Sequence, residues 1–248
     1  MEKLRVAIIG TGGISHAHIR AWKKMPDCQV IACCDLDGDK ARRFAQDYDI
    51  PSVYTHYAEL MAREKPDCVS VCTWNSAHAP VTITALRGGA HVLCEKPAAA
   101  CYAEALEMQR VQHETGLVLN IGVVTRFHES VEKVRALIAS SALGDVYHVF
   151  VSFRSFRCIP GIGGQFTTKA LSGGGVLIDW GVHRIDQVMY LVGDPEPLRV
   201  NAAIFGCLGR DIPNYHYRKM WSEETRNPGG TYDVEESCTA LLRTSGPV

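Results

Sequence analysis

The chain has 248 residues, of which 46% are hydrophobic and 21% charged, so it can bury a sizeable core in one large domain or two modest ones. Its formal net charge of −1 excludes the basic bias of nucleic-acid-binding proteins, and no apolar run reaches the roughly 18 residues of a membrane-spanning helix. The first residues lead into a short apolar run without the apolar core of a signal peptide, so we expect neither nucleic acid nor membrane as a partner.

The first half of the chain alternates short apolar runs with helical patterns. Strands are predicted over residues 6–9, 30–34, 68–72, 91–94 and 118–123, and helices over 14–25, 39–48, 58–64, 80–87 and 102–115. Several strand runs are apolar on both faces, as in a parallel sheet covered by helices. This alternation predicts an α/β domain with a doubly wound parallel sheet over residues 1–123.

After residue 123 the pattern changes. A helix is predicted over 129–140, a long alternating strand over 145–157, a helix over about 181–191, and strands near 198–205 and 234–243. Residues 124–248 are therefore expected to form a substrate-binding α+β domain with an open-faced, mostly antiparallel sheet. The turn signal Ser245-Gly246-Pro247 has no return strand after it, so we expect the chain to end inside its own sheet.

The ten cysteines lie mostly inside apolar strand runs, where a free thiol behaves as a small hydrophobic side chain. No Cys-x-x-Cys pair and no Cys/His zinc spacing is present, so we expect no metal. Buried, reduced thiols indicate a reducing compartment, and we expect a cytoplasmic protein.

The segment Gly10-Thr11-Gly12-Gly13-Ile14-Ser15 follows the first strand and opens the first helix, which is the context of a dinucleotide-binding loop. Gly10 permits the tight turn, Gly12 lets the backbone approach a pyrophosphate, and Ser15 stands at the third glycine position. The helix N-terminus then offers free N–H groups to the phosphates.

Asp35 ends the second strand pattern, where a carboxylate can accept hydrogen bonds from both adenosine ribose hydroxyls and repel a 2′-phosphate. This favours NAD over NADP as the cofactor, although Lys40, Arg42 and Arg43 lie close enough to keep NADP open. The alternative is a simple glycine turn with an aspartate that caps the following helix.

Glu95-Lys96-Pro97 comes where the fifth strand ends, and ligands of open α/β sheets bind beyond the carboxyl ends of strands. A lysine there can reach the reacting end of a cofactor and donate to a substrate oxygen. The alternative is an ordinary exposed Glu–Lys pair.

Asp179 and His183 are four residues apart, so on a helix they share a face. A carboxylate beside an imidazole fixes its tautomer and raises its basicity, and such a histidine can take a hydroxyl proton while hydride leaves the same carbon. The alternative is that Asp179 caps the helix and His183 packs beneath the sheet.

The polar and aromatic segment 207–232 is long for a loop in a compact domain. It suits either a substrate or subunit contact or a solvated excursion. Its hydrogen-bonding and aromatic residues include Tyr215, Tyr217, Lys219, Trp221 and Arg226.

Three motifs together, namely Gly10-Thr11-Gly12-Gly13, Glu95-Lys96-Pro97 and the run from Gly173 to Asp186, resemble the Gfo/Idh/MocA family of NAD(P)-dependent oxidoreductases in order and separation. The resemblance implies a Rossmann domain, a C-terminal domain with an open-faced sheet, and action on sugars, inositols and related polyols. It also implies a homo-oligomer formed through the open sheet face.

The resemblance places the family's catalytic residues on Lys96, Asp179 and His183, which also contact substrate together with Arg126. It assigns further cofactor contacts by position, and these fall on Ile14, Thr73, Asn75, His78, Glu95 and Lys96.

Residues 179–183 and 231–234 are similar to those of glucoside 3-dehydrogenases, which oxidise the C3 hydroxyl of a glucoside. We therefore expect NAD-dependent oxidation of a secondary hydroxyl of a sugar, glycoside or inositol. Two alternatives stay open: an NAD-dependent glycosidase that uses transient C3 oxidation and elimination, and a non-catalytic NAD-binding or assembly subunit. Family members are usually longer, which agrees with a chain that ends inside its sheet.

Overall fold

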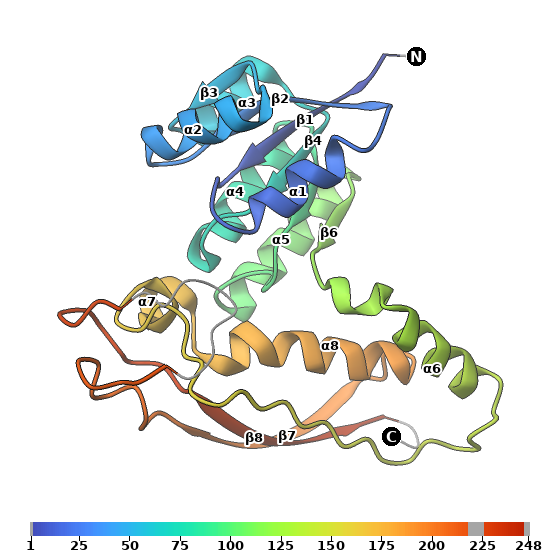
Figure 1. Cartoon of the computed structure of the whole chain (residues 1–248). Coiled ribbons are helices and arrows are strands. Elements are labelled where there is room, and N and C mark those ends of the chain that lie inside the picture. Colours follow the sequence, from blue (N-terminus) through green and yellow to red (C-terminus); the bar gives the residue numbers. More distant parts are fainter. Residues whose placement is uncertain (1, 218–225, 246–248) are drawn as a thin grey trace. The chain divides into compact units, whose positions relative to one another are not determined.

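The computed structural model describes residues 2–217 and 226–245 and divides the chain into two compact units, Met1–Gly122 and Val123–Val248. Figure 1 shows the helices and strands of both units. Lys219, Trp221 and the predicted turn beyond Ser245 lie outside the described residues.

The first unit is built on a six-stranded parallel sheet with strand order β3-β2-β1-β4-β5-β6. The strands are β1 (Leu4–Ile9), β2 (Cys28–Cys34), β3 (Ser52–Tyr54), β4 (Cys68–Val71), β5 (His91–Cys94) and β6 (Leu119–Ile121). The direction of winding reverses between β1 and β4, which is where ligands bind in open α/β sheets. The predicted doubly wound parallel sheet is confirmed.

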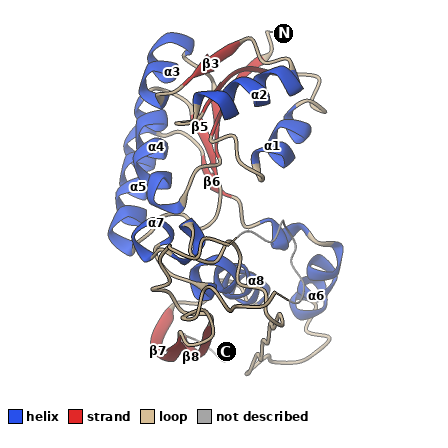
Figure 2. Cartoon of the chain, turned by 60° about the vertical axis from the view of Figure 1, so that its left-hand side comes forward, coloured by secondary structure: helices blue, strands red, loops and turns tan. Residues whose placement is uncertain are grey.

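Helices cover both faces of this sheet. They are α1 (Ser15–Trp22), α2 (Gly38–Tyr48), α3 (Tyr57–Glu64), α4 (Asn75–Arg87) and α5 (Tyr102–Thr115). In Figure 2, α1 and α2 lie on one face and α3, α4 and α5 on the other. Ile8, Ile19 and Phe44 pack in the core under α1 and α2, whereas Val69 and Leu86 belong to the larger core on the opposite face. Apolar strands are thus buried from both sides.

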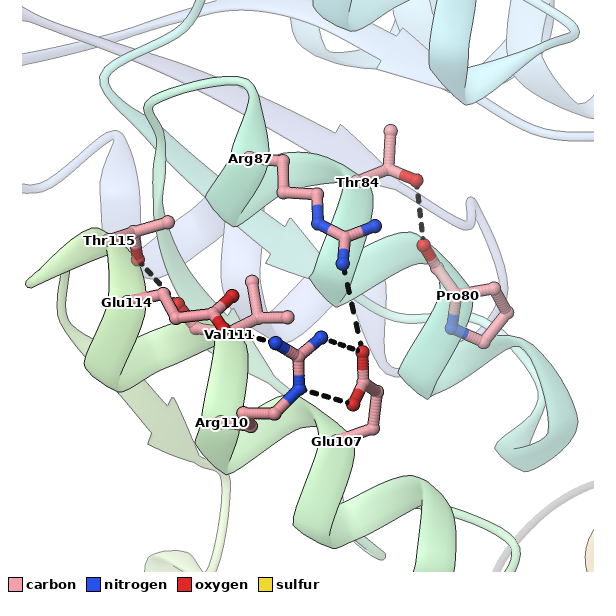
Figure 3. Close-up of polar contacts among 8 residues, drawn as sticks. All are labelled: Pro80, Thr84, Arg87, Glu107, Arg110, Val111, Glu114 and Thr115. Atoms are coloured by element: carbon pink, nitrogen blue, oxygen red, sulfur yellow. Dashed lines mark hydrogen bonds and ion pairs between the residues drawn. The ribbon is translucent and has the colours of Figure 1, made fainter.

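An exposed charge network links α4 to α5 (Figure 3). Arg110 donates from Nε to Glu107 at 2.7 Å and also pairs with Glu114, and Arg87 lies 3.7 Å from Glu107. Because all four side chains are 41–58% exposed, the network adds little stability, and the buried residues beneath hold the helices together.

The second unit contains more helix than sheet. Its elements are η1 (Val124–Phe127), α6 (Glu129–Ala139), η2 (Gln165–Thr167), α7 (Lys169–Ser172), η3 (Leu177–Gly181), α8 (Val182–Leu191), β7 (Pro197–Phe205) and β8 (Ser237–Thr244). Strands β7 and β8 pair antiparallel, from Pro197 opposite Thr244 to Phe205 opposite Ser237. The predicted α+β fold with an antiparallel sheet is therefore confirmed, and the strands of this small sheet expose apolar side chains such as Val200 and Leu241.

The strand predicted over residues 145–157 is wrong. These residues have no regular secondary structure, and Tyr147 and Phe150, which the alternation assigned to opposite faces, are 81% and 80% exposed. A strand requires a hydrogen-bonded neighbour. Among the described residues of this unit, the sheet consists of β7 and β8, so the alternating pattern has no partner here.

The described part of segment 207–232 folds back on the chain. Ile212 and Tyr215 form a small buried core with Ile162, and Arg226 donates to the carbonyl of Pro213 at 2.6 Å. This part of the segment is therefore packed rather than fully solvated, and its contact with a substrate or subunit stays a prediction.

Each of the ten cysteines is a free thiol in the structure. Within the described ranges, the helices are too short or too polar to cross a bilayer.

Candidate functional site

The glycine-rich loop lies between the carboxyl ends of β1, β2 and β4. Gly10 has a φ of +93° and donates to the carbonyl of Cys34 at 2.8 Å. A Cβ at Gly10 would lie 2.4 Å from the carbonyl oxygen of Cys72, a separation that no side chain tolerates. Both the dihedral angle and the close approach therefore require glycine at this position.

The outer side of the same loop is open. A Cβ added at Gly12 or Gly13 would meet nothing within 4 Å, and Ile14 before α1 is 48% exposed. Ser15, at the third glycine position, is fully buried and donates to the carbonyl of Gly12 at 2.5 Å. The first turn of α1 carries no acidic residue, so its N–H groups and positive dipole end can hold a phosphate.

Asp35 connects the end of β2 to the glycine-rich loop. Its Oδ2 accepts from the backbone N–H and the hydroxyl of Thr11, both at 2.9 Å, and its Oδ1 accepts from the N–H of Asp37 at 3.0 Å. A carboxylate offers about four acceptor positions, so Asp35 can accept from a further donor.

Asp37, rather than Asp35, caps α2. Its carboxylate accepts from the N–H groups of Asp39 and Lys40 at 3.0 and 3.2 Å. These bonds, above all that from Lys40, hold the pKa of Asp37 below its usual value. The cap is thus provided by a neighbour, and Asp35 is available for another role.

Lys96 is the second residue after β5, is half-buried, and forms a cis peptide bond with Pro97. Glu95 before it is buried, and its two carboxylate oxygens face inward: Oε1 lies 2.8 Å from Nε2 of His18, and Oε2 accepts from the backbone N–H of Lys96 at 3.2 Å. Burial by itself would raise the pKa of Glu95, but the contacts with His18 and Lys96 outweigh it and the pKa is lowered.

His78 on α4 links two loops at the same edge of the sheet. Its ring is 1% exposed, with Nδ1 2.6 Å from the carbonyl oxygen of Pro97 and Nε2 3.1 Å from that of Thr73. Burial lowers the pKa of His78 despite these two acceptors. Thr73 donates to the carbonyl of Trp74, and Asn75 begins α4.

Asp179 and His183 lie on one continuous helical segment of the second unit. Asp179 belongs to η3, a turn of π-helix, and His183 to the first turn of α8. The Trp180 ring stacks on Phe153 at 4.5 Å and lies 6.1 Å from the His183 ring. Single π-helical turns inside longer helices are frequent at functional sites.

Glu235 holds the start of that segment, and we did not predict this role from the sequence. Its carboxylate accepts from the N–H groups of Gly175 and Leu177 at 2.9 and 3.0 Å, and its carbonyl accepts from Val176 at 2.9 Å. A Cβ at Gly175 would lie 1.9 Å from the carbonyl oxygen of Glu235. The contact joins residues about 60 positions apart, for which the spacing of residue types gives no signal.

Arg126, predicted to face substrate, is held by α8. Its Nε donates to Asp186 at 2.7 Å, and its guanidinium lies 5.0 Å from the centre of the Tyr190 ring. The hydrogen bond with Asp186 raises the pKa of Arg126. Its contact with substrate stays a prediction.

The first unit therefore brings the glycine-rich loop, Asp35, His78, Glu95 and Lys96 to the carboxyl ends of neighbouring strands. Asp179, His183 and Arg126 belong to the second unit, and each group is described within its own unit. The catalytic, cofactor and substrate roles of these residues stay predictions.

Comparison with known proteins matches both units. The profile GFO_IDH_MocA, "Oxidoreductase family, NAD-binding Rossmann fold", matches residues 4–123, and GFO_IDH_MocA_C3, "GFO/IDH/MocA C-terminal domain", matches residues 131–248. D-glucoside 3-dehydrogenase from Escherichia coli (strain K12) is 36% identical over 236 residues, which is 94% of this chain. The chain spans 65% of that enzyme's length.

Solved structures of similar fold include GenD2 from gentamicin A biosynthesis, which was crystallised in complex with NAD. It has a TM-score of 0.79 at 22% identity, covering 99% of this chain and 63% of that one. Myo-inositol 2-dehydrogenase from Lactobacillus plantarum has a TM-score of 0.76 at 21% identity, covering 98% and 67%.

Proposed function

Because the chain belongs to the Gfo/Idh/MocA family of oxidoreductases, with an NAD-binding Rossmann domain, we propose that it oxidises a secondary hydroxyl of a sugar, glycoside or inositol. The observation that carries the proposal is the 36% identity with D-glucoside 3-dehydrogenase over 94% of the chain. The C3 hydroxyl of a glucoside is accordingly the specific position that we propose.

The residues of the first unit fit a dinucleotide. The glycine-rich loop presents an open surface at Gly12 and Gly13 next to the N-terminus of α1, as a pyrophosphate requires. NAD, when bound, supplies the nicotinamide ring that accepts the hydride. Asp35 retains acceptor capacity for the ribose hydroxyls while Thr11 fixes its orientation.

NAD is the preferred cofactor in this proposal. The carboxylate of Asp35 repels a 2′-phosphate, and its position is fixed by three hydrogen bonds. Arg42, a cation that could bind such a phosphate, instead pairs with Asp39 at 2.6 Å. This pair is exposed and adds little stability, but it places a carboxylate beside the arginine.

In this proposal, three residues act on the hydroxyl proton and the oxygen of the substrate. His183 accepts the hydroxyl proton, Asp179 on the same helical segment orients its imidazole, and Lys96 donates a hydrogen bond to the substrate oxygen. Glu235 supports this chemistry indirectly, because it fixes the backbone from which Asp179 and His183 extend.

The test is to incubate the purified chain with NAD and each of a panel of glucosides and inositols, and to monitor NADH formation by its absorbance. NADH binding is measured separately by fluorescence. We expect NADH formation with at least one glucoside, and a loss of about 100-fold or more in kcat for Lys96→Ala and for His183→Ala, with NADH binding retained.

Three results would contradict the proposal. Sugar release without net NADH formation would instead favour the glycosidase alternative. NADH binding without turnover of any polyol would favour a non-catalytic subunit, and full activity of both alanine variants would exclude the assigned residues.

A further inference from the structure

His18, Glu95, Ser70 and Trp22 form a hydrogen-bonded network next to Lys96, and the reaction proposed above gives none of these four residues a role. The centre of this network is the contact between Nε2 of His18 on α1 and Oε1 of Glu95, at 2.8 Å. The two side chains are only 9% and 12% exposed. Polar groups buried to this extent are costly unless each finds a partner.

At the end of this network away from Lys96, residues of α1 contact a residue of β4. Nδ1 of His18 lies 3.2 Å from the hydroxyl of Ser70, a fully buried residue, and the indole N–H of Trp22 donates to that hydroxyl at 2.8 Å. Indole N–H is only a donor, so the serine oxygen accepts from Trp22 and still has its proton and a second lone pair for Nδ1 of His18. A carboxylate only accepts, so Nε2 of His18 donates to Glu95.

At its other end, the network contacts Lys96 through Glu95. Oε2 of Glu95 accepts from the backbone N–H of Lys96 at 3.2 Å, and the backbone N–H of Glu95 donates to the carbonyl of Val71 at 2.9 Å. Gly122 packs against the same carboxylate, since a Cβ there would lie 3.2 Å from Oε1. The carboxylate is thus enclosed by strand ends and α1, and it bonds to the backbone of the residue that follows it.

We propose that His18 and Glu95 are positioning residues for Lys96, which they tie to the helix that begins at the glycine-rich loop. This role is separate from the cofactor contact that the family resemblance implies for Glu95, which stays a prediction, since each of its carboxylate oxygens makes one contact inside the unit. The inference rests on the proposed function only in taking Lys96 as the residue that acts on the substrate oxygen.

The expected effect of losing the pair follows from geometry. A catalytic group displaced by about 1 Å can lower the rate by about 100-fold. We therefore expect His18→Ala and Glu95→Ala to lower kcat by roughly 10- to 100-fold, with the KM for the sugar changed by less than about threefold. The Kd for NADH should also change by less than about threefold in His18→Ala, because His18 has no predicted contact with the cofactor. The double variant should lose little more than Glu95→Ala alone, since both substitutions remove one and the same support.

Two variants separate this role from a general loss of packing. His18→Gln keeps an N–H donor that can reach Glu95, so it should restore most of kcat. His16→Ala is the matched control, because His16 is on the same helix but bonds to the hydroxyl of Tyr48 on α2, at 2.8 Å. We expect His16→Ala to leave kcat unchanged.

The environment of the Lys96 side chain can also be measured by NMR without any substrate. Lysines are reductively methylated with ¹³C-formaldehyde and a borane reductant, and the Lys96 resonance is identified by its loss in Lys96→Arg. The resonance should shift in His18→Ala and Glu95→Ala, and should stay at its wild-type position in His18→Gln and His16→Ala. This measurement tests the positioning of Lys96 separately from the proposed function. A chain without activity would refute the proposed function, whereas the Lys96 spectrum would still show whether His18 and Glu95 hold Lys96 in place.

The inference is overturned if the Lys96 resonance of folded Glu95→Ala matches wild type. It is overturned equally if His18→Gln behaves as His18→Ala does in both the spectrum and kcat. Should His18→Ala fail to fold, Glu95→Ala and His18→Gln still decide the question.

Discussion

Replacement of Asp35 by asparagine removes the negative charge that we expect to face the adenosine ribose, with almost no change in side-chain shape. The asparagine oxygen can continue to accept both hydrogen bonds from Thr11, which Oδ2 accepts at 2.9 Å. Its amide group would then face the N–H of Asp37, so one hydrogen bond is lost. That loss costs about 1 kcal/mol of stability.

The expected change in NADPH affinity follows from the repulsion between the Asp35 carboxylate and the 2′-phosphate of NADPH. Two like charges about 5 Å apart repel by ~3 kcal/mol at an effective dielectric constant of about 20, and by under ~1 kcal/mol in bulk water. Asp35 is half-buried, so we expect a value between these limits. Asp35→Asn should therefore tighten NADPH binding by roughly 10- to 100-fold. It should weaken NADH binding about fivefold, since a charged acceptor is replaced by a neutral one.

The assay is fluorescence titration with NADH and NADPH, which requires no knowledge of the substrate. The matched control is Asp49→Asn, which makes the same change in net charge at the C-terminal end of α2, where the carboxylate is 95% exposed. If Asp35→Asn folds normally and its affinity for NADPH equals that of Asp49→Asn, then Asp35 does not face the 2′ position and the reasoning fails.

Three further predictions concern the framework of the site. Gly10→Ala places a Cβ 2.4 Å from the carbonyl oxygen of Cys72 at a φ of +93°, and should lower the free energy of unfolding by about 2–5 kcal/mol in urea titrations. Gly12→Ala meets nothing within 4 Å, so it should leave stability within about 0.5 kcal/mol and weaken NADH binding; equal stability losses at the two glycines would contradict this. Glu235→Ala removes the acceptor of two part-buried N–H groups and should cost about 1–3 kcal/mol in the same titrations, with Glu235→Gln less affected. Burial lowers the pKa of His78 below 6.5, so the unfolded chain protonates first as the pH falls. Stability should therefore be lost from about pH 6.5 downward to the folded pKa, and an unchanged pH slope in His78→Gln would refute this.

Several elements could be predicted because local composition decides them. β5 and α5 have the predicted bounds, and the apolar runs of β1, β2 and β4 are buried on both faces. The glycine-rich loop has a local signature too, since a strand, two glycines and a helix follow one another directly. The requirement for glycine at position 10, however, comes from Cys72, more than sixty residues further along the chain.

Other features have no local signature. β3 is three residues long and is a strand because it pairs with β2, whereas residues 145–157 alternate as a strand does and lack a neighbour among the described residues. Propensity and alternation favour an extended backbone, and pairing decides whether a sheet forms.

The sequence by itself determined the family and most strands and helices of the first unit, and it predicted the residues that carry the proposed chemistry, because burial periodicity and short motifs are local properties of the chain. Only the tertiary structure decided what supports those residues. His18 lies 77 positions from Glu95, and Glu235 lies about 60 from Gly175, yet each pair is in hydrogen-bond contact. Such contacts depend on how distant elements pack, and residue spacing along the chain does not encode which side chains will meet.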